Sequence, residues 1–204
     1  DLHSFPTRRS SDLNLCAGRS GKNGSMAVPQ ENPLVHIEKL VHGGRGLGRL
    51  GSGKVVLVTG ALPGERVRIA VQQEARGHAE AVVREIVAAA AERVRPACPY
   101  YPDCGGCDLQ HAAYAAQLRL KTGIVRESLQ CAGLAPPAET GVLASPLPYG
   151  YRFRLRLHLS RQGLGFYRRQ SNTLVPVNRC LLASEGINTA LAKIAADPDF
   201  IRRG

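Results

Sequence analysis

Residues 34–59 read LVHIEKLVHGGRGLGRLGSGKVVLVT, and this stretch decides the fold of the N-terminal part of the chain. Apolar and β-branched residues dominate its two ends, Leu34 to Val41 and Lys54 to Thr59, as they do in strands. The glycines between them are typical of turns. Residues 46–51 match the G-x-G-x-x-G pattern of dinucleotide-binding loops, but a strand-like run follows where such a loop needs a helix. We therefore predict two strands separated by a glycine-rich turn in a barrel.

Two further β-like runs follow, from Glu65 to Gln73 and from His78 to Val87, with a Pro63-Gly64 turn before the first. Short strands at this spacing, punctuated by glycine turns, favour a small closed sheet. The segment from residue 34 to about residue 91 is therefore expected to form an OB-like barrel, a fold that often binds nucleic acid.

Three cysteines come directly after this segment, in Cys98-Pro-Tyr-Tyr-Pro-Asp-Cys104-Gly-Gly-Cys107. Prolines prevent a regular helix here, and glycines let the backbone wrap closely around a ligand. Ligation by thiolates alone selects zinc or iron–sulfur chemistry, and either site needs a fourth ligand. Cys180, which follows a strand and a turn, is favoured over Cys131, for which a small buried thiol in a helix is the ordinary explanation.

Zinc, an iron–sulfur cluster and disulfides are the three chemistries open to these thiols. Disulfides are disfavoured because nothing in the sequence indicates secretion. Paired zinc knuckles carry two C-x2-C pairs, whereas five residues separate Cys98 from Cys104 and the fourth cysteine is remote. The spacing therefore favours an iron–sulfur site and leaves structural zinc as the alternative.

Helices are expected on both sides of the C-terminal strands. Asp108 can cap a helix that reaches about Cys131 and stops at Gly133. A second helix is expected from Glu185 to Ala195. We read residues 93–133 as a cysteine loop and helix.

An antiparallel meander of three strands is predicted between the helices. In residues 151–159 apolar residues occupy the odd positions and basic residues the even ones, which is the period of a half-buried strand. Two more strands are expected at 164–168 and 173–177. Between Tyr151 and Arg169 there are six arginines and no acidic residue. This composition favours contact with phosphates and stacked bases.

The charge of the chain fits a polyanionic partner. Lys and Arg number 27 against 16 Asp and Glu, a net charge of +11. No apolar run is long enough to span a membrane, so RNA is the favoured partner and a membrane is not. The candidate RNA-binding residues are basic or aromatic and come from the barrel turn and the meander: Arg45, Arg49, Lys54, Arg152, Arg154, Arg156, Tyr167, Arg168 and Arg169.

The cysteine segment resembles the cluster motif of bacterial RNA uracil-C5 methyltransferases in Cys98-x5-Cys104-Gly-Gly-Cys107-Asp-Leu-Gln110-His111. Residues 36–49 and 60–65 resemble that family's TRAM domain, a five-stranded OB-like RNA-binding barrel. Residues 150–154, 164–169 and 174–180 resemble its central domain. The resemblance is greatest to the 23S rRNA type, and Phe153 departs from it at a position that is often Asn.

This resemblance implies a [4Fe-4S] cluster on Cys98, Cys104, Cys107 and Cys180. It also implies an S-adenosylmethionine-dependent reaction on a uridine of 23S rRNA. In the family the catalytic cysteine, the glutamate base and the S-adenosylmethionine site lie in a Rossmann-like C-terminal domain. We expect no catalytic and no S-adenosylmethionine-binding residue in this chain, which we interpret as the N-terminal part of such an enzyme, inactive by itself.

The predicted fold class is thus β-rich α+β without the Rossmann-like domain. Four segments are expected: a spurious or disordered extension at 1–25, a TRAM domain at 26–92, the cysteine loop and helix at 93–133, and a truncated central RNA-binding domain at 134–204. A cytoplasmic monomer is expected. The alternative function is a non-catalytic RNA-binding module with a structural zinc or iron–sulfur site.

Overall fold

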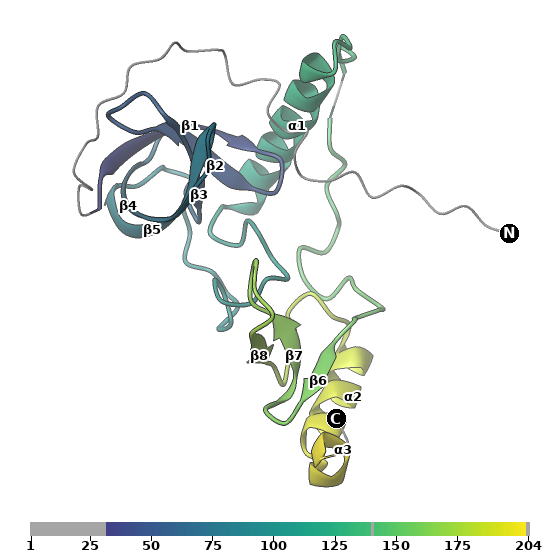
Figure 1. Cartoon of the computed structure of the whole chain (residues 1–204). Helices are drawn as coiled ribbons and strands as arrows, with labels where there is room; N and C mark the ends of the chain where they lie inside the picture. The colour runs from purple at the N-terminus through teal and green to yellow at the C-terminus, as the bar shows by residue number, and fades with distance from the viewer. Residues whose placement is uncertain (1–31, 140, 203–204) are drawn as a thin grey trace, which may run out of the picture. The chain divides into compact units, whose positions relative to one another are not determined.

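Five strands close a barrel in the N-terminal part of the chain (Figure 1). The computed structural model describes residues 32–139 and 141–202, so the predicted extension at 1–25 lies outside the described residues. The strands pair in the order β1-β2-β3-β5-β4, all antiparallel except β3 with β5. Their bounds are β1 Leu34–Val41, β2 Arg45–Arg49, β3 Val55–Thr59, β4 Arg66–Glu74 and β5 His78–Ala88.

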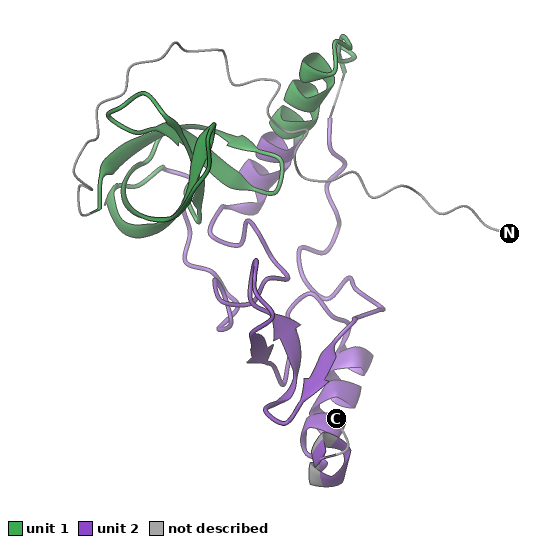
Figure 2. Ribbon diagram, in the orientation of Figure 1, with its two compact units in different colours: residues 1–90, 122–140 green, residues 91–121, 141–204 purple. Residues whose placement is uncertain are grey.

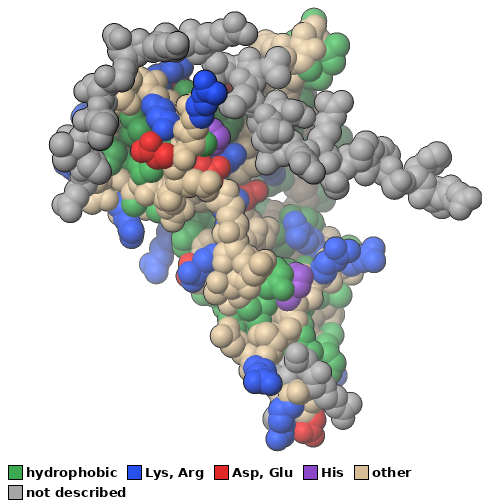
Figure 3. Space-filling model, viewed as in Figure 1, with side chains coloured by type: hydrophobic (Ala, Val, Ile, Leu, Met, Phe, Trp, Pro, Cys, Tyr) green, Lys and Arg blue, Asp and Glu red, His purple; other side chains and the backbone are tan. Residues whose placement is uncertain are grey.

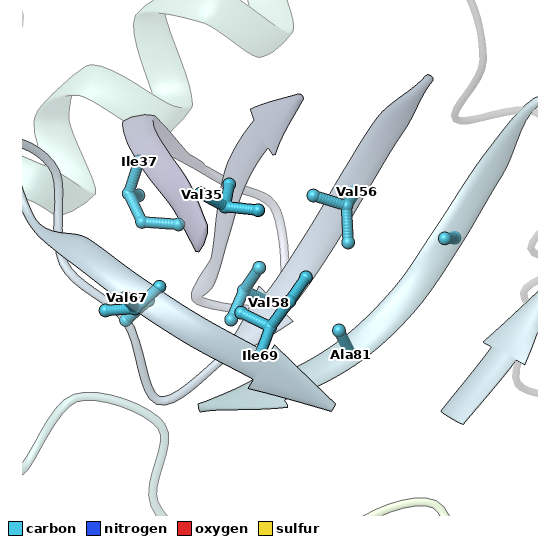
Figure 4. Packing of buried hydrophobic residues seen from close by; sticks show 9 residues of the cluster. Val35, Ile37, Val56, Val58, Val67, Ile69 and Ala81 are labelled. Atoms are coloured by element: carbon cyan, nitrogen blue, oxygen red, sulfur yellow. The ribbon is translucent and has the colours of Figure 1, made fainter. Parts of the chain in front are cut away.

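The barrel interior is filled by the inward-facing residues of these strands (Figure 4). In the first half of β1 the buried residues Val35 and Ile37 alternate with exposed ones, which is the period of two expected for a strand with one covered face. The register shifts between Ile37 and Lys39, so the next buried residue is Leu40. Burying each Val or Ile side chain contributes about 1.5–3 kcal/mol. The core consists of Val35, Ile37, Val56, Val58, Ala61, Val67, Ile69, Ala79 and Ala81.

The predicted glycine-rich turn at residues 46–51 was wrong in part, because Arg45–Arg49 forms strand β2. This strand pairs with β1 on one side and β3 on the other. A Cβ atom built on Gly48 would lie 2.5 Å from Val35 Cγ1 and 2.6 Å from His36 O. Glycine is therefore needed here for the close approach of two strands rather than for a turn.

A buried carboxylate fastens the loop before β4. Glu65 is fully buried, and its two oxygens accept hydrogen bonds from the backbone N–H groups of Leu62 (2.8 Å) and Ala90 (3.2 Å). These bonds hold the Pro63-Gly64 turn against the segment that leaves β5. A buried charge is tolerated when backbone donors satisfy it in this way.

The chain divides into two compact units, residues 1–90 with 122–140 and residues 91–121 with 141–204 (Figure 2). Helix α1, Tyr114–Cys131, contributes to both. Its predicted start at Asp108 was wrong. The backbone of residues 111–113 pairs instead with residues 92–94, through bonds such as Val94 N–H to His111 O, and is not available to a helix. The predicted stop is confirmed: Gly133 has a φ of 75°.

The second unit contains a three-stranded antiparallel sheet of β6 His158–Ser160, β7 Gly163–Tyr167 and β8 Leu174–Pro176. The meander is therefore confirmed, but its first strand is much shorter than predicted. Apart from an isolated bridge between Arg152 and Ala183, residues 151–157 have no strand pairing within the described part of the chain. Phe153, expected on an inward face, is 82% exposed. An alternating pattern predicts a strand only where a neighbouring strand supplies hydrogen bonds.

Helix α2 spans Glu185–Ala195, with the predicted bounds. Helix α3, Pro198–Arg202, was not predicted. None of the helices in the described ranges is long and apolar enough to cross a membrane.

Candidate metal centre

Four cysteines from two distant segments meet at one pocket of the second unit. Cys98, Cys104 and Cys107 lie on the loop after the barrel, and Cys180 lies on the loop between β8 and α2. All four line the same pocket and all four are free thiols. Cys131, the other candidate for the fourth position, ends α1 and is not among the lining residues. The structure therefore brings together the set of four that the sequence predicted.

The cysteine loop is held against β7 by backbone pairing. Gly105 N–H donates to Tyr167 O at 3.0 Å, and Cys104 forms an isolated antiparallel bridge with Arg168. A Cβ atom on Gly105 would lie 2.7 Å from Tyr167 O and 3.0 Å from Arg169 N. The first glycine of the Gly-Gly pair thus lets the loop dock edge-on to the strand.

A glutamine amide spans the ends of the loop. Gln110 Oε1 accepts a hydrogen bond from the N–H of Cys98 at 3.3 Å, and Gln110 Nε2 donates to Cys107 Sγ at 3.2 Å. Sequence reasoning used Gln110 only as part of a motif. Its position three residues after a candidate ligand was the available signal for such a contact.

Arg168 and Arg169, predicted to contact RNA, make ion pairs with the cysteine loop. Arg168 lies 3.3 Å from Asp103. Arg169 forms an ion pair with Asp108 and donates to the carbonyl of Cys107 at 3.0 Å. The side chain of Arg169 is only 24% exposed. Its contacts assign Arg169 to support of the loop, whereas Arg168 remains half exposed.

Cys180 is positioned by a buried side chain that sequence reasoning missed. Asn188, in the first turns of α2, accepts a hydrogen bond from the N–H of Cys180 at 2.9 Å and donates to its carbonyl at 3.1 Å. The Asn188 side chain also donates to Ala183 O at 3.2 Å. A polar residue on the apolar face of α2 was the only signal for this role.

The two cysteine segments are also joined directly. Tyr100 OH donates to Asn178 Oδ1 at 2.6 Å, and the N–H of Asn178 donates to the same hydroxyl at 3.2 Å. Because Tyr100 precedes Cys104 and Asn178 precedes Cys180, this contact sets the spacing of the two segments beside the pocket. His111, the last residue of the motif, is buried and stacks on Tyr101.

Burial raises the pKa of both thiols in the middle of the loop. For Cys104 the largest cause is desolvation, opposed by a backbone hydrogen bond from Gly106. For Cys107 it is again desolvation, opposed by the hydrogen bond from Gln110 and reinforced by the charges of Cys104, Cys180 and Cys98. Desolvation also raises the pKa of Tyr101 to about 12. Several thiolates at one pocket repel one another, and a bound cation removes that cost.

The donor set fits a thiolate-ligated group. Four sulfur ligands are the set used by iron–sulfur clusters and by structural zinc. Within residues 32–139 and 141–202, however, no three or more His, Cys, Asp or Glu side chains form a group that could hold a metal ion. This candidate centre is therefore defined by the four sulfur ligands and the pocket that they share. It is not defined by side chains already arranged around a metal position.

The barrel residues predicted to contact RNA are engaged in ion pairs. Arg45 lies 2.7 Å from Glu80, and Lys54 lies 2.8 Å from Glu74. Arg49 lies 3.4 Å from Glu38 and is 47% exposed. Arg45 is the most buried of the three, so its guanidinium is the least accessible to a phosphate.

The meander residues of the same prediction differ in accessibility. Arg154 and Arg156 are exposed. Arg152 lies over the Tyr151 ring, 5.9 Å from its centroid, and lines the cysteine pocket. Tyr167 is 39% exposed and stacks on His158 with ring centroids 3.9 Å apart. Figure 3 shows Lys and Arg side chains on the drawn face of both units, with Asp and Glu near several of them.

Comparison with known proteins defines the class of the barrel. Residues 31–83 match the model of the TRAM domain. The chain is 39% identical over 167 residues to an uncharacterized RNA methyltransferase of Aquifex aeolicus, covering 81% of this chain and 39% of that protein. It is 40% identical over 160 residues to the 23S rRNA (uracil(1939)-C(5))-methyltransferase RlmD of Halomonas elongata, covering 76% and 33%.

The chain thus contains a TRAM domain and is similar to proteins named as RNA methyltransferases, and it spans 39% and 33% of the lengths of these two relatives. A solved structure has a similar fold, that of the Pyrococcus abyssi tRNA (uracil-54, C5)-methyltransferase in complex with S-adenosyl-L-homocysteine. The TM-score is 0.56 at 22% identity, covering 83% of this chain and 37% of that one. At this identity the likeness concerns the fold alone.

Proposed function

We propose that this chain is the RNA-binding and cluster-binding part of an S-adenosylmethionine-dependent RNA uracil-C5 methyltransferase that acts on 23S rRNA. The observation that carries the proposal is the convergence of Cys98, Cys104, Cys107 and Cys180 on one pocket beside an arginine-rich meander. The TRAM match and the relatives named as 23S rRNA methyltransferases support RNA as the partner.

The four thiols would hold a [4Fe-4S] cluster. Their arrangement, three on one loop and the fourth beyond β8, ties the segment that follows the barrel to the end of the meander. Such a group stabilises the fold because its ligands come together only in the folded chain. The role assigned to it here is structural: it orients the loop and the strand that carries Arg168 at its end.

RNA would bind through exposed cations of the meander and of the barrel. Arg154 and Arg156 are exposed, which suits contacts with phosphates. Tyr167 offers a partly exposed ring for stacking. The boundaries proposed for the RNA-binding segments are 26–92 for the TRAM domain and 134–204 for the central domain.

S-adenosylmethionine would supply the methyl group in the complete reaction. Of the cysteines in the described part of the chain, four line the thiol pocket and Cys131 ends α1. We expect the isolated chain to bind RNA as a monomer without methylating it. A cytoplasmic location is part of the proposal, since it keeps the four thiols reduced.

Metal analysis after anaerobic purification tests the cluster. We expect about four irons per chain in the unaltered protein. Cys180→Ala should lose most of this iron, whereas Cys131→Ala, at a cysteine outside the pocket, should retain it. Zinc in place of iron would favour the alternative, a non-catalytic RNA-binding module with a structural zinc site.

Salt-dependent RNA binding tests the proposed RNA surface. The double variant Arg154→Gln/Arg156→Gln should weaken binding to a 23S rRNA transcript. The slope of log K against log salt should fall by about 0.7 for each lost contact with single-stranded RNA. The control is Arg68→Gln, at a barrel arginine that lies 3.3 Å from Glu85. Equal losses in both variants would contradict the assignment, and methyl transfer by the isolated chain would contradict its predicted inactivity.

A further inference from the structure

The Gln110 side chain forms hydrogen bonds with two of the four candidate ligands. Its carbonyl oxygen accepts from the N–H of Cys98 at 3.3 Å, and its amide nitrogen donates to Cys107 Sγ at 3.2 Å. The orientation of the amide follows from the chemistry of its partners. A backbone N–H can only donate, so the oxygen must face Cys98 and the NH2 group must face the sulfur.

The two contacts have different consequences. The bond from Cys98 is a backbone contact that holds one end of the loop in place. The bond to Cys107 reaches the sulfur itself and is strongest when that sulfur carries negative charge. Hydrogen bonds to cluster sulfurs are one of the means by which a protein sets the reduction potential of a cluster.

Two other side chains contact the backbone of the candidate ligands and not their sulfur atoms. Arg169 donates to the Cys107 carbonyl, and Asn188 bonds to the backbone of Cys180. These contacts orient the ligands without a hydrogen bond to a thiol. Gln110 therefore combines positioning with a direct electrostatic effect.

We propose that Gln110 is a positioning residue that sets both the loop geometry and the reduction potential of the group bound by the four cysteines. This inference rests on the proposed cluster. The donor stabilises the more negative, reduced form, so its removal should move the potential to more negative values.

Two substitutions separate the two contacts of Gln110. Gln110→Leu keeps a side chain of similar size and removes both hydrogen bonds. Gln110→Glu keeps an acceptor for the N–H of Cys98, but its carboxylate cannot donate to Cys107 Sγ. The matched control is Gln117→Leu, because Gln117 Nε2 also donates a partly buried hydrogen bond, at 2.9 Å, but to the carbonyl of Ala112.

The measurements are iron and sulfide content, the midpoint potential by spectroscopic redox titration, and the rate of iron loss to a chelator, all under anaerobic conditions. In Gln110→Leu the reduction equilibrium should fall about tenfold, which is about 59 mV for a one-electron couple, and iron loss should be faster. Gln110→Glu should show the potential shift with slower iron loss than Gln110→Leu. Gln117→Leu should match the unaltered protein.

The outcomes separate this inference from the proposed function. If the unaltered protein holds no iron, the proposed cluster fails and the inference fails with it. If the unaltered protein holds a cluster and both Gln110 variants keep its potential, the inference alone is overturned. If Gln117→Leu shifts the potential as much as Gln110→Leu, the effect belongs to general destabilisation of the loop and the inference is again overturned.

Discussion

The Gly105-Gly106 pair offers a sharp test of how the cysteine loop docks on β7. In Gly105→Ala the new methyl group would lie 2.7 Å from Tyr167 O and 3.0 Å from Arg169 N, and both are backbone atoms that cannot rotate away. In Gly106→Ala the nearest atom is Cys104 Sγ at 3.5 Å, an ordinary van der Waals distance. Neighbouring glycines of the same motif should thus respond differently to the same substitution.

The expected cost of Gly105→Ala combines overpacking with loss of a backbone hydrogen bond. Overpacking of a filled site costs about 1–3 kcal/mol. The bond from Gly105 to Tyr167, 3.0 Å long, adds about 1 kcal/mol if the loop moves off the strand. With a urea dependence of about 1–3 kcal/mol per molar, the unfolding midpoint should fall by about 1 M.

Anaerobic urea unfolding, followed by circular dichroism and by metal release, measures this difference. Gly106→Ala should keep a midpoint within about 0.2 M of the unaltered protein, since surface changes usually cost less than about 0.5 kcal/mol. Equal midpoints for the two variants would refute the edge-on docking of the loop. Destabilisation by Gly106→Ala alone would refute it as well.

Two further predictions concern the barrel. Glu65→Ala leaves the N–H groups of Leu62 and Ala90 without the carboxylate, so the free energy of unfolding should fall by about 2 kcal/mol or more in thermal or urea unfolding. Glu85→Ala, at an exposed glutamate, should change it by less than about 0.5 kcal/mol. Gly48→Ala should cost about 1–3 kcal/mol because its methyl group would meet β1, whereas Gly51→Ala, with open space around it, should be tolerated. Unchanged stability of Glu65→Ala or Gly48→Ala would contradict the contacts described for them.

The hydrophobic pattern of the sequence correctly predicted two barrel strands and one helix. The strands at 34–41 and 55–59 and the helix at 185–195 lie at or within a residue of where the pattern indicates. Strand β2 was missed because Gly46 and Gly48 read as a turn. Glycine is needed at these two positions because β1 lies so close to them. A local sequence pattern gives no sign of such a contact between strands.

Two errors arose because the partners of backbone hydrogen bonds are decided by other segments of the chain. Asp108 has the chemistry of a helix cap, but residues 111–113 pair with residues 92–94 and delay the helix to Tyr114. Residues 151–157 alternate as a strand should, yet beyond the bridge at Arg152 the described residues provide no neighbour. Local propensity cannot decide where a backbone donor finds its acceptor.

The sequence by itself determined that the ligands of the candidate centre are thiolates, because the residue types and their spacing decide which ligands are available. Cys98, Cys104 and Cys107 lie too close along the chain to be separated by folding. Only the tertiary structure decided the remainder. It brought Cys180 to the same pocket, made Gln110 and Asn188 its supports and engaged Arg169 with the loop. The meeting of Cys180 with the loop and the contacts of Arg169 join segments that are distant in the sequence, and such long-range pairing is not encoded in any single segment.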